Sequence, residues 1–259
     1  MEIRALSTPA EIQAALAFVR GQFLDQDSLG YPQEGMASFL QYLENAATGL
    51  DFLEADGDEG TEGVLAYAPA TFHLSLFFVA KGKQKQGIGR ALMQEFLKRA
   101  QEQHAARISV NAAAAAVDAY KALGFELCGD AETRDGISFQ PMEYLLACDW
   151  LGREVTVVID RPYGSLHPHY PDLLYTCNYG YVEELMGAGG EFQDAYVYGP
   201  QEPLEKFRGI VIAIIYRRND NESKWVVSDG SAFLKQDVIN AVGFQEQYFD
   251  TRFVWLERQ

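Results

Sequence analysis

A strand, a glycine-containing loop and the start of a helix follow one another in Phe77-Phe78-Val79-Ala80-Lys81-Gly82-Lys83-Gln84-Lys85-Gln86-Gly87-Ile88-Gly89-Arg90. The apolar run 73–79 predicts a buried strand, and the spacing of apolar residues over 87–103 predicts an amphipathic helix. The first N–H groups of a helix lack intrahelical partners and lie at its positive end, so this turn can bind a phosphate. Four of the eleven basic residues in 1–147 fall within 81–90, which supports an anion site, whereas two glycines at this spacing by themselves favour the alternative of an exposed loop.

Strand-like and helix-like segments alternate on both sides of this stretch. We expect strands at 2–6, 50–55, 63–70, 108–110, 125–128 and 137–146, and helices starting at 9, covering 33–45 and ending near 123–124. Alternation of this kind predicts an α/β (α+β) domain over 1–147.

The pattern changes after residue 150. Runs at 155–160, 173–182, 194–198, 210–217, 224–228 and 252–256 read as strands, with one helix at 234–249. This predicts a second domain over 150–259, a small closed or partly open β-barrel with a C-terminal helix.

Composition excludes several classes of protein. The 259 residues include 21 Lys and Arg against 37 Asp and Glu, a formal net charge of −16, which disfavours nucleic acid as a partner and favours cationic or metal-bound ligands. No apolar run is long enough for a transmembrane helix, so no membrane partner is expected. Three scattered cysteines and the absence of a secretory signal indicate a cytoplasmic protein.

Two motifs resemble those of the GNAT N-acetyltransferases. Gln84-Lys85-Gln86-Gly87-Ile88-Gly89 is similar to the family's Gln/Arg-x-x-Gly-x-Gly/Ala signature, and Val110-Asn111 followed by Ala116 and 120–125 (Tyr-Lys-Ala-Leu-Gly-Phe) is similar to its second signature. The resemblance implies a mixed central sheet and an enzyme that transfers acetyl from acetyl-CoA to the amine of a small molecule or peptide. It also implies an acceptor side near 31–35 and Phe39, and it leaves the amine and the oligomeric state open.

The same resemblance assigns roles to individual residues. The amides of 86–90 would bind the pyrophosphate of coenzyme A, the strand ending at Phe78 and Val79 would pair with its pantetheine arm, and Tyr120 would protonate the leaving thiolate. The full set of implied coenzyme A contacts is Phe78, Val79, Gln84, Gln86, Gly87, Ile88, Gly89, Arg90 and Asn111.

A general base is not evident from the sequence. The family often places a carboxylate near the strand that here reads 71–76, where His73 is the available group, and Glu34 is the other candidate. A structural role for either residue is the alternative.

The second domain resembles family I inorganic pyrophosphatases through Tyr175-Thr176-Cys177-Asn178-Tyr179-Gly180-Tyr181. This implies an OB-like barrel in which Glu191, Asp194, Asp220 and Glu222 hold Mg²⁺, and Lys224, Tyr175, Tyr179 and Tyr248 bind phosphate. Gly189 replaces the first family carboxylate, and no Lys or Arg lies between 161 and 175, so we expect impaired hydrolysis. His167 and His169 could bind a metal or an anion, or lie in a solvent loop.

The sequence therefore predicts a GNAT-type N-acetyltransferase fused to a degenerate pyrophosphatase-like domain. One alternative is a Mg²⁺-dependent phosphoanhydride hydrolase whose N-terminal domain senses coenzyme A. The other is a binding protein without catalytic activity.

Overall fold

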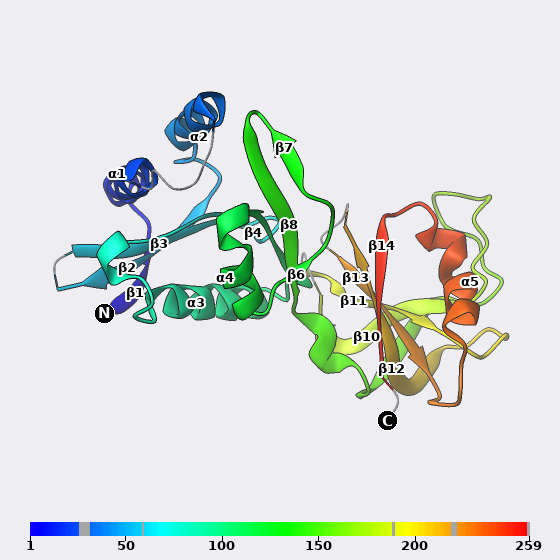
Figure 1. Ribbon diagram of the computed structural model, residues 1–259. Helices are drawn as coiled ribbons and strands as arrows, with labels where there is room; N and C mark the ends of the chain where they lie inside the picture. Colours follow the sequence, from blue (N-terminus) through cyan, green and yellow to red (C-terminus); the bar gives the residue numbers. More distant parts are fainter. Residues whose placement is uncertain (26–31, 59, 188–189, 219–221, 258–259) are drawn as a thin grey trace. The chain divides into compact units, whose positions relative to one another are not determined.

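A computed structural model describes residues 1–25, 32–58, 60–187, 190–218 and 222–257 of the chain (Figure 1). The chain divides into two compact units. The first contains Met1–Glu102 and Arg107–Leu145, and the second contains Gln103–Ala106 and Leu146–Gln259. None of the helices in the described ranges combines the length and apolarity needed to cross a membrane.

The first unit is built on one mixed sheet with the order β1-β2-β3-β4-β5-β8-β6, and β7 pairs with β8. β4 and β5 run parallel and the other neighbouring pairs run antiparallel, which confirms the mixed sheet that the GNAT resemblance implies. The strands are β1 (Glu2–Leu6), β2 (Asp51–Gly57), β3 (Gly60–Ala68), β4 (His73–Val79), β5 (Arg107–Ala113), β6 (Glu126–Leu127), β7 (Glu132–Arg134) and β8 (Ile137–Leu145). The short strand β7 was not predicted.

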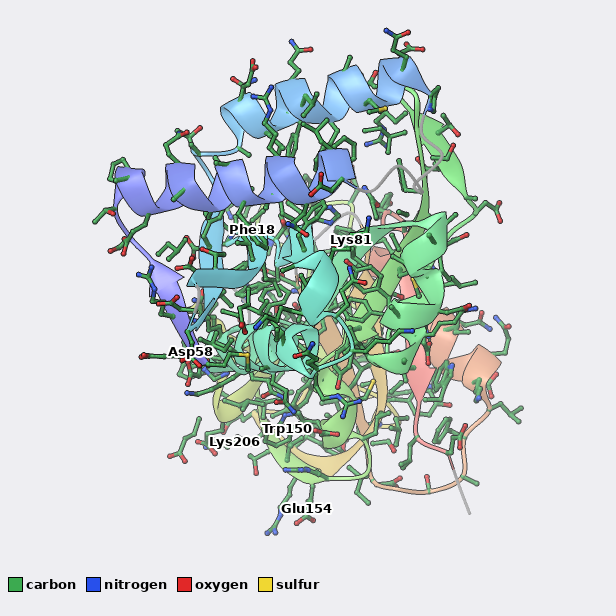
Figure 2. All side chains as sticks on the ribbon, turned by 60° about the vertical axis from the view of Figure 1, so that its left-hand side comes forward. Phe18, Asp58, Lys81, Trp150, Glu154 and Lys206 are labelled. Atoms are coloured by element: carbon green, nitrogen blue, oxygen red, sulfur yellow. The ribbon has the colours of Figure 1, made fainter. Side chains whose placement is uncertain are left out.

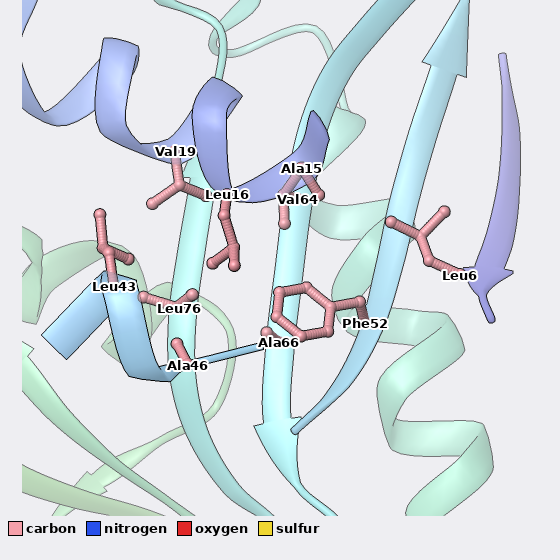
Figure 3. Close-up of a cluster of buried hydrophobic side chains, with 10 residues drawn as sticks. All are labelled: Leu6, Ala15, Leu16, Val19, Leu43, Ala46, Phe52, Val64, Ala66 and Leu76. Carbon is pink, nitrogen blue, oxygen red and sulfur yellow. The ribbon is translucent and has the colours of Figure 1, made fainter. Parts of the chain in front are cut away.

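Helices cover both faces of this sheet. α1 (Pro9–Asp25) and α2 (Gln33–Asn45) lie on one face, and α3 (Ile88–Glu102) lies on the other (Figure 1). Figure 3 shows how α1 and α2 bury apolar side chains such as Leu16 and Leu43 against Phe52, Val64 and Leu76 of the strands. α4 (Val117–Ala122) follows β5. The start of α1 carries a capping box, because Glu11 accepts hydrogen bonds from the backbone N–H and the hydroxyl of Thr8.

A β-bulge in β4 determines which side chains reach each face. Ala66 of β3 pairs with Leu76, but Tyr67 pairs with Leu74, so Ser75 is an extra residue in β4. Without the bulge, His73 would lie on the face opposite Leu76. With it, His73 lies on the same face as Leu76, the face covered by α1 and α2.

The second unit contains a closed barrel of five strands. β13, β11, β10, β9 and β12 pair in a ring, and β14 adds to β12. The strands are β9 (Glu154–Arg161), β10 (Asn178–Met186), β11 (Phe192–Val197), β12 (Lys206–Arg217), β13 (Ser223–Ser228) and β14 (Thr251–Trp255). α5 (Lys235–Glu246) contributes Val238 and Val242 to a cluster of buried side chains with Tyr196 and Val226. The predicted small barrel with a C-terminal helix is thus confirmed, while its OB-like, pyrophosphatase-like identity stays a prediction.

Candidate functional site

A cavity of about 1010 Å³ lies within the first unit. It is lined by most of the residues that the sequence predicts to contact coenzyme A or to act in catalysis, namely Phe78, Val79, Gln84, Gly87, Gly89, Arg90, Asn111 and Tyr120. Gln86 and Ile88 are not among the described lining residues. Ile88 is buried, and the side-chain amide of Gln86 donates to the carbonyl oxygen of Gly82 at 3.1 Å.

One end of the cavity is the start of α3. The first hydrogen bond of the helix runs from the amide of Ala91 to the carbonyl of Gly87 at 2.9 Å, so the amides of 88–90 have no acceptor within the helix. Gly87 has a φ of +91°, a left-handed conformation that glycine adopts without strain. The loop thus presents backbone N–H groups at the positive end of the helix, an arrangement suited to an anion.

The four basic residues of this loop differ in their surroundings. Lys81 lies beside the end of α1, where its ammonium donates to the carbonyl oxygen of Asp25 at 3.4 Å (Figure 2). Lys83 forms an ion pair with Glu62 at 2.8 Å. Lys85 and Arg90 line the cavity. Of these four cations, only Lys85 and Arg90 are therefore placed to act on a ligand in the cavity.

The body of the cavity is an opening between β4 and β5. The two strands pair only at His73 with Ser109 and at Leu74 with Val110, whereas β4 stays paired with β3 up to Val79. Among the described residues, none pairs as a strand with the edge of β4 on the β5 side from Ser75 onward. An extended ligand can occupy this position and hydrogen bond to the free strand edge.

Tyr120 lies in α4 and lines the cavity, with 8% of its surface exposed. Its ring packs against Phe77 and Phe125, with centroid distances of 6.1 and 5.4 Å. Phe77 also lies 3.3 Å from the position that a β-carbon on Gly89 of α3 would take, so Phe77 is on the α3 face of the sheet. Because its ring packs against Phe77, Tyr120 lies on the same face. Burial raises the pKa of Tyr120 well above its usual range, so the phenol keeps its proton at neutral pH.

His73 lines the cavity from the opposite face of the sheet. Its Nδ1 lies 2.9 Å from the Oγ of Ser109, and Ser109 is the cross-strand partner of the buried Glu143. Burial, followed by the charge of Arg107, lowers the pKa of His73, so the imidazole is neutral at neutral pH. The other candidate base, Glu34, is exposed on α2 and is not among the described lining residues.

The far wall of the cavity joins α2 to the turn between β7 and β8. A β-carbon on Gly35 would stand 2.3 Å from the carbonyl oxygen of Gly136, so the two segments touch through their backbones. Arg134 at the end of β7 and Asp135 in this turn both line the cavity. Neither residue was predicted from the sequence, although the dipeptide Asp135-Gly136 is a typical signal of a two-residue hairpin turn.

A family model described as an acetyltransferase (GNAT) domain matches residues 30–146. Residues 30–146 are a GNAT acetyltransferase domain. The expectation of a GNAT-type acetyltransferase is thereby confirmed at the level of the family. The matched segment contains the α3 loop, both strands of the opening and Tyr120, and α1 lies before it.

Solved structures similar to the chain include several acetyltransferases. One is a GCN5-related N-acetyltransferase from Rhodopseudomonas palustris, at 16% identity and a TM-score of 0.48, covering 56% of this chain and 95% of that one. Another is the PaiA N-acetyltransferase from Thermoplasma acidophilum in complex with coenzyme A, at 17% identity and a TM-score of 0.45, covering 56% and 99%. A ribosomal-protein-alanine N-acetyltransferase from Brucella melitensis has 25% identity and a TM-score of 0.41, covering 56% and 100%. None of the curated proteins matches the chain.

Outside the GNAT domain, the predicted metal ligands are not grouped around an open position. The ammonium of Lys224 lies against the carboxylates of both Asp194 and Glu222. Glu191 is exposed, and Asp220 lies outside the described residues. In the described ranges no three His, Cys, Asp or Glu side chains come close enough together to hold a metal ion. The described residues alone therefore do not form a Mg²⁺ site, and the full predicted set, which includes Asp220, stays a prediction.

The predicted phosphate-binding tyrosines lie in different environments. Tyr175 and Tyr179 are buried, with ring centroids 5.7 Å apart, whereas Tyr248 is 68% exposed. Burial raises the pKa of Tyr179, and the nearby charge of Asp194 adds to the rise. His167 and His169 pair with each other, since the backbone N–H of His169 donates to the Nδ1 of His167 at 3.1 Å.

A buried ion pair in the second unit was not foreseen from the sequence. Arg217 on β12 contacts Glu246 on α5 through two hydrogen bonds, at 2.5 and 3.1 Å, and both side chains are almost fully buried. The hydroxyl of Tyr196 also donates to Glu246, at 2.6 Å. The guanidinium of Arg217 stacks 3.6 Å from the ring centroid of Phe249. This network ties the helix to the barrel.

Proposed function

We propose that the GNAT domain transfers the acetyl group of acetyl-CoA to an amine. The observation that carries this proposal is the opening between β4 and β5, with helix amides and two cations at one end and a phenol beside it. In this arrangement the pyrophosphate lies at the amides of 88–90 with Lys85 and Arg90 beside it. The pantetheine arm follows the free edge of β4 past Val79 and Phe78, and Asn111 contacts it from β5.

The reaction needs one proton donor and one proton acceptor. The amine nitrogen attacks the thioester carbonyl carbon, the C–N bond forms, and the C–S bond breaks. Tyr120 gives its proton to the departing sulfur, and the nitrogen loses a proton to a base. His73 suits the second role because it is neutral and lines the cavity from the face opposite Tyr120. Acid and base thus flank the opening from its two sides, and alignment of the two reactants supplies the remaining acceleration.

Calorimetry with acetyl-CoA tests the donor site without knowledge of the amine. We expect saturable binding to the full chain, and an absence of binding would refute the proposal. Tyr120→Phe removes the proton and keeps the ring, so it should bind acetyl-CoA normally and release coenzyme A more slowly. Release of the free thiol can be followed with a disulfide reagent, and an unchanged rate would refute the role of Tyr120 as the acid.

For the second unit we keep the more limited proposal of a pyrophosphatase-like barrel with impaired hydrolysis. Two observations support the impairment, namely the contact of Lys224 with Asp194 and Glu222 and the lack of a three-ligand cluster among the described residues. Hydrolysis of pyrophosphate needs clustered carboxylates for divalent cations. Phosphate release from pyrophosphate in the presence of Mg²⁺, well above the blank, would contradict this proposal.

A further inference from the structure

The charge inside the cavity is opposite to that of the whole chain. The chain has a net charge of −16, yet its described cavity-lining residues include the cations Lys85, Arg90 and Arg134 and a single carboxylate, Asp135. Lys85 and Arg90 belong to the helix end of the cavity, where the proposed function places phosphates. The other end therefore offers an amine one negative and one positive side chain.

Aromatic rings form one wall of this acceptor end. Phe39 of α2 packs against Phe23 of α1 with a centroid distance of 4.2 Å, and it also contacts Tyr42 at 6.3 Å and Phe78 at 6.1 Å. All four rings line the cavity. Tyr42 is 41% exposed, so part of its ring does not pack against the neighbouring rings. The wall thus has aromatic surface available for a ligand.

A second wall of the acceptor end is also apolar. Ile137 and Phe139 of β8 line the cavity, and the backbone contact between Gly35 and Gly136 joins the two walls. Arg134 lies above Phe139, with its guanidinium carbon 5.6 Å from the ring centroid. A flat apolar group suits the acceptor slot that these residues line, because it can bury area against their side chains and stack on the rings.

We infer that the acceptor is an amine that carries one positive charge and a flat, apolar, preferably aromatic body. This inference rests on the proposed acetyltransferase function. A polycationic acceptor would need several carboxylates to replace the water around its charges, and the described lining residues offer only Asp135. A carboxylate next to the amine is compatible with the slot, because Arg134, whose present ion pair with Glu132 at 3.2 Å is solvent-exposed, can exchange that partner for it.

The test compares amines at saturating acetyl-CoA, with release of coenzyme A as the readout. The panel contains 2-phenylethylamine, phenylalanine, spermidine and the aminoglycoside kanamycin. We expect kcat/KM for at least one of the two aromatic amines to exceed that for either polycation by tenfold or more. A preference for spermidine or kanamycin, or no turnover of either aromatic amine, would overturn the inference.

Two variants on α2 link the preference to the aromatic wall. Tyr42→Ala removes a ring from the cavity, so kcat/KM for the preferred aromatic amine should fall on the order of tenfold. Met36→Ala is the matched control, because Met36 is similarly exposed on the same helix and is not among the described lining residues. An equal effect of the two substitutions would overturn the inference.

Calorimetry with acetyl-CoA distinguishes a failure of the proposed function from a failure of the acceptor class. If the chain does not bind acetyl-CoA, the proposed function fails. If acetyl-CoA binds and the aromatic amines are not preferred, only the acceptor class is wrong.

Discussion

Substitution of Gly35 by alanine has two opposing effects on stability, a gain in helix propensity and a steric overlap with Gly136. In an exposed helix, alanine is more favourable than glycine by up to about 1 kcal/mol. At Gly35 the added carbon would stand 2.3 Å from the carbonyl oxygen and 2.8 Å from the carbonyl carbon of Gly136. Relief of this overlap requires α2 and the β7–β8 turn to separate by about 1 Å, because ordinary contacts lie near 3.5 Å.

We expect Gly35→Ala to destabilise the first unit. Overpacking of this kind costs about 1 to 3 kcal/mol, which cancels or exceeds the gain from propensity. The control is Gly21→Ala in α1, where nothing lies within 4 Å of the new carbon. That variant should be more stable than the natural chain by up to about 1 kcal/mol. Scanning calorimetry compares the two, and a Gly35→Ala variant as stable as Gly21→Ala would refute the backbone contact.

The same variant has a functional consequence. The displaced elements carry the acceptor wall, including Tyr42 and Asp135, whereas the donor end lies on β4 and α3. A displacement near 1 Å can lower the rate on the order of 100-fold when it disturbs alignment. We therefore expect kcat/KM for the amine to fall while the Kd for acetyl-CoA stays unchanged. Weaker acetyl-CoA binding would contradict the assignment of the two ends.

Three further substitutions test separate parts of the structure. Lys85→Gln should weaken acetyl-CoA binding about tenfold in calorimetry, because it removes a charged phosphate contact. Lys83→Gln is the control: it loses only the ion pair with Glu62 and should leave acetyl-CoA binding unchanged. In the natural chain, kcat/KM should fall as the pH drops through the pKa of His73, which burial and Arg107 hold below 6.5, and His73→Gln should abolish this acidic limb. Glu246→Gln should lower the free energy of unfolding in urea by about 3 to 5 kcal/mol because Arg217 stays buried, whereas Glu154→Gln at an exposed pair should cost less than about 1 kcal/mol.

The donor end of the site could be predicted because its signals are local. The strand, loop and helix of 73–103 follow one another in the chain, and Gly87 and Gly89 lie where the helix begins. Tyr120 follows from a second local pattern, the Tyr-to-Phe run of 120–125. The basic residues were only partly predictable, because Lys83 pairs with Glu62, which lies on another strand.

The acceptor end depends on contacts between segments that are distant in sequence. His73 faces the α1 and α2 side because Ser75 is bulged, and the bulge is visible only in the register between β3 and β4. Arg134 and Asp135 reach the cavity because the β7–β8 turn touches α2 at Gly35. No periodicity within a single segment encodes either arrangement.

The carboxylates of the second unit show the same limit of prediction from sequence, because their contacts depend on the folded arrangement. Their order along the chain resembled a Mg²⁺ site, and the sequence also placed Lys224 close by. Spacing alone could not tell whether Lys224 would point toward a ligand or neutralise its neighbours. In the structure its side chain is 5% exposed and contacts both Asp194 and Glu222.

Net charge is therefore a poor guide to either site. The −16 of the chain favoured a cationic ligand, but the charged residues among the described cavity lining are mostly cations, and two described carboxylates of the barrel contact one lysine. A charge at the surface is screened over about 8 to 10 Å of salt solution, whereas a charge inside a cavity acts on a ligand at contact distance. Recognition of the amine must then rest on the few groups that line the slot, and most of these are aromatic or aliphatic.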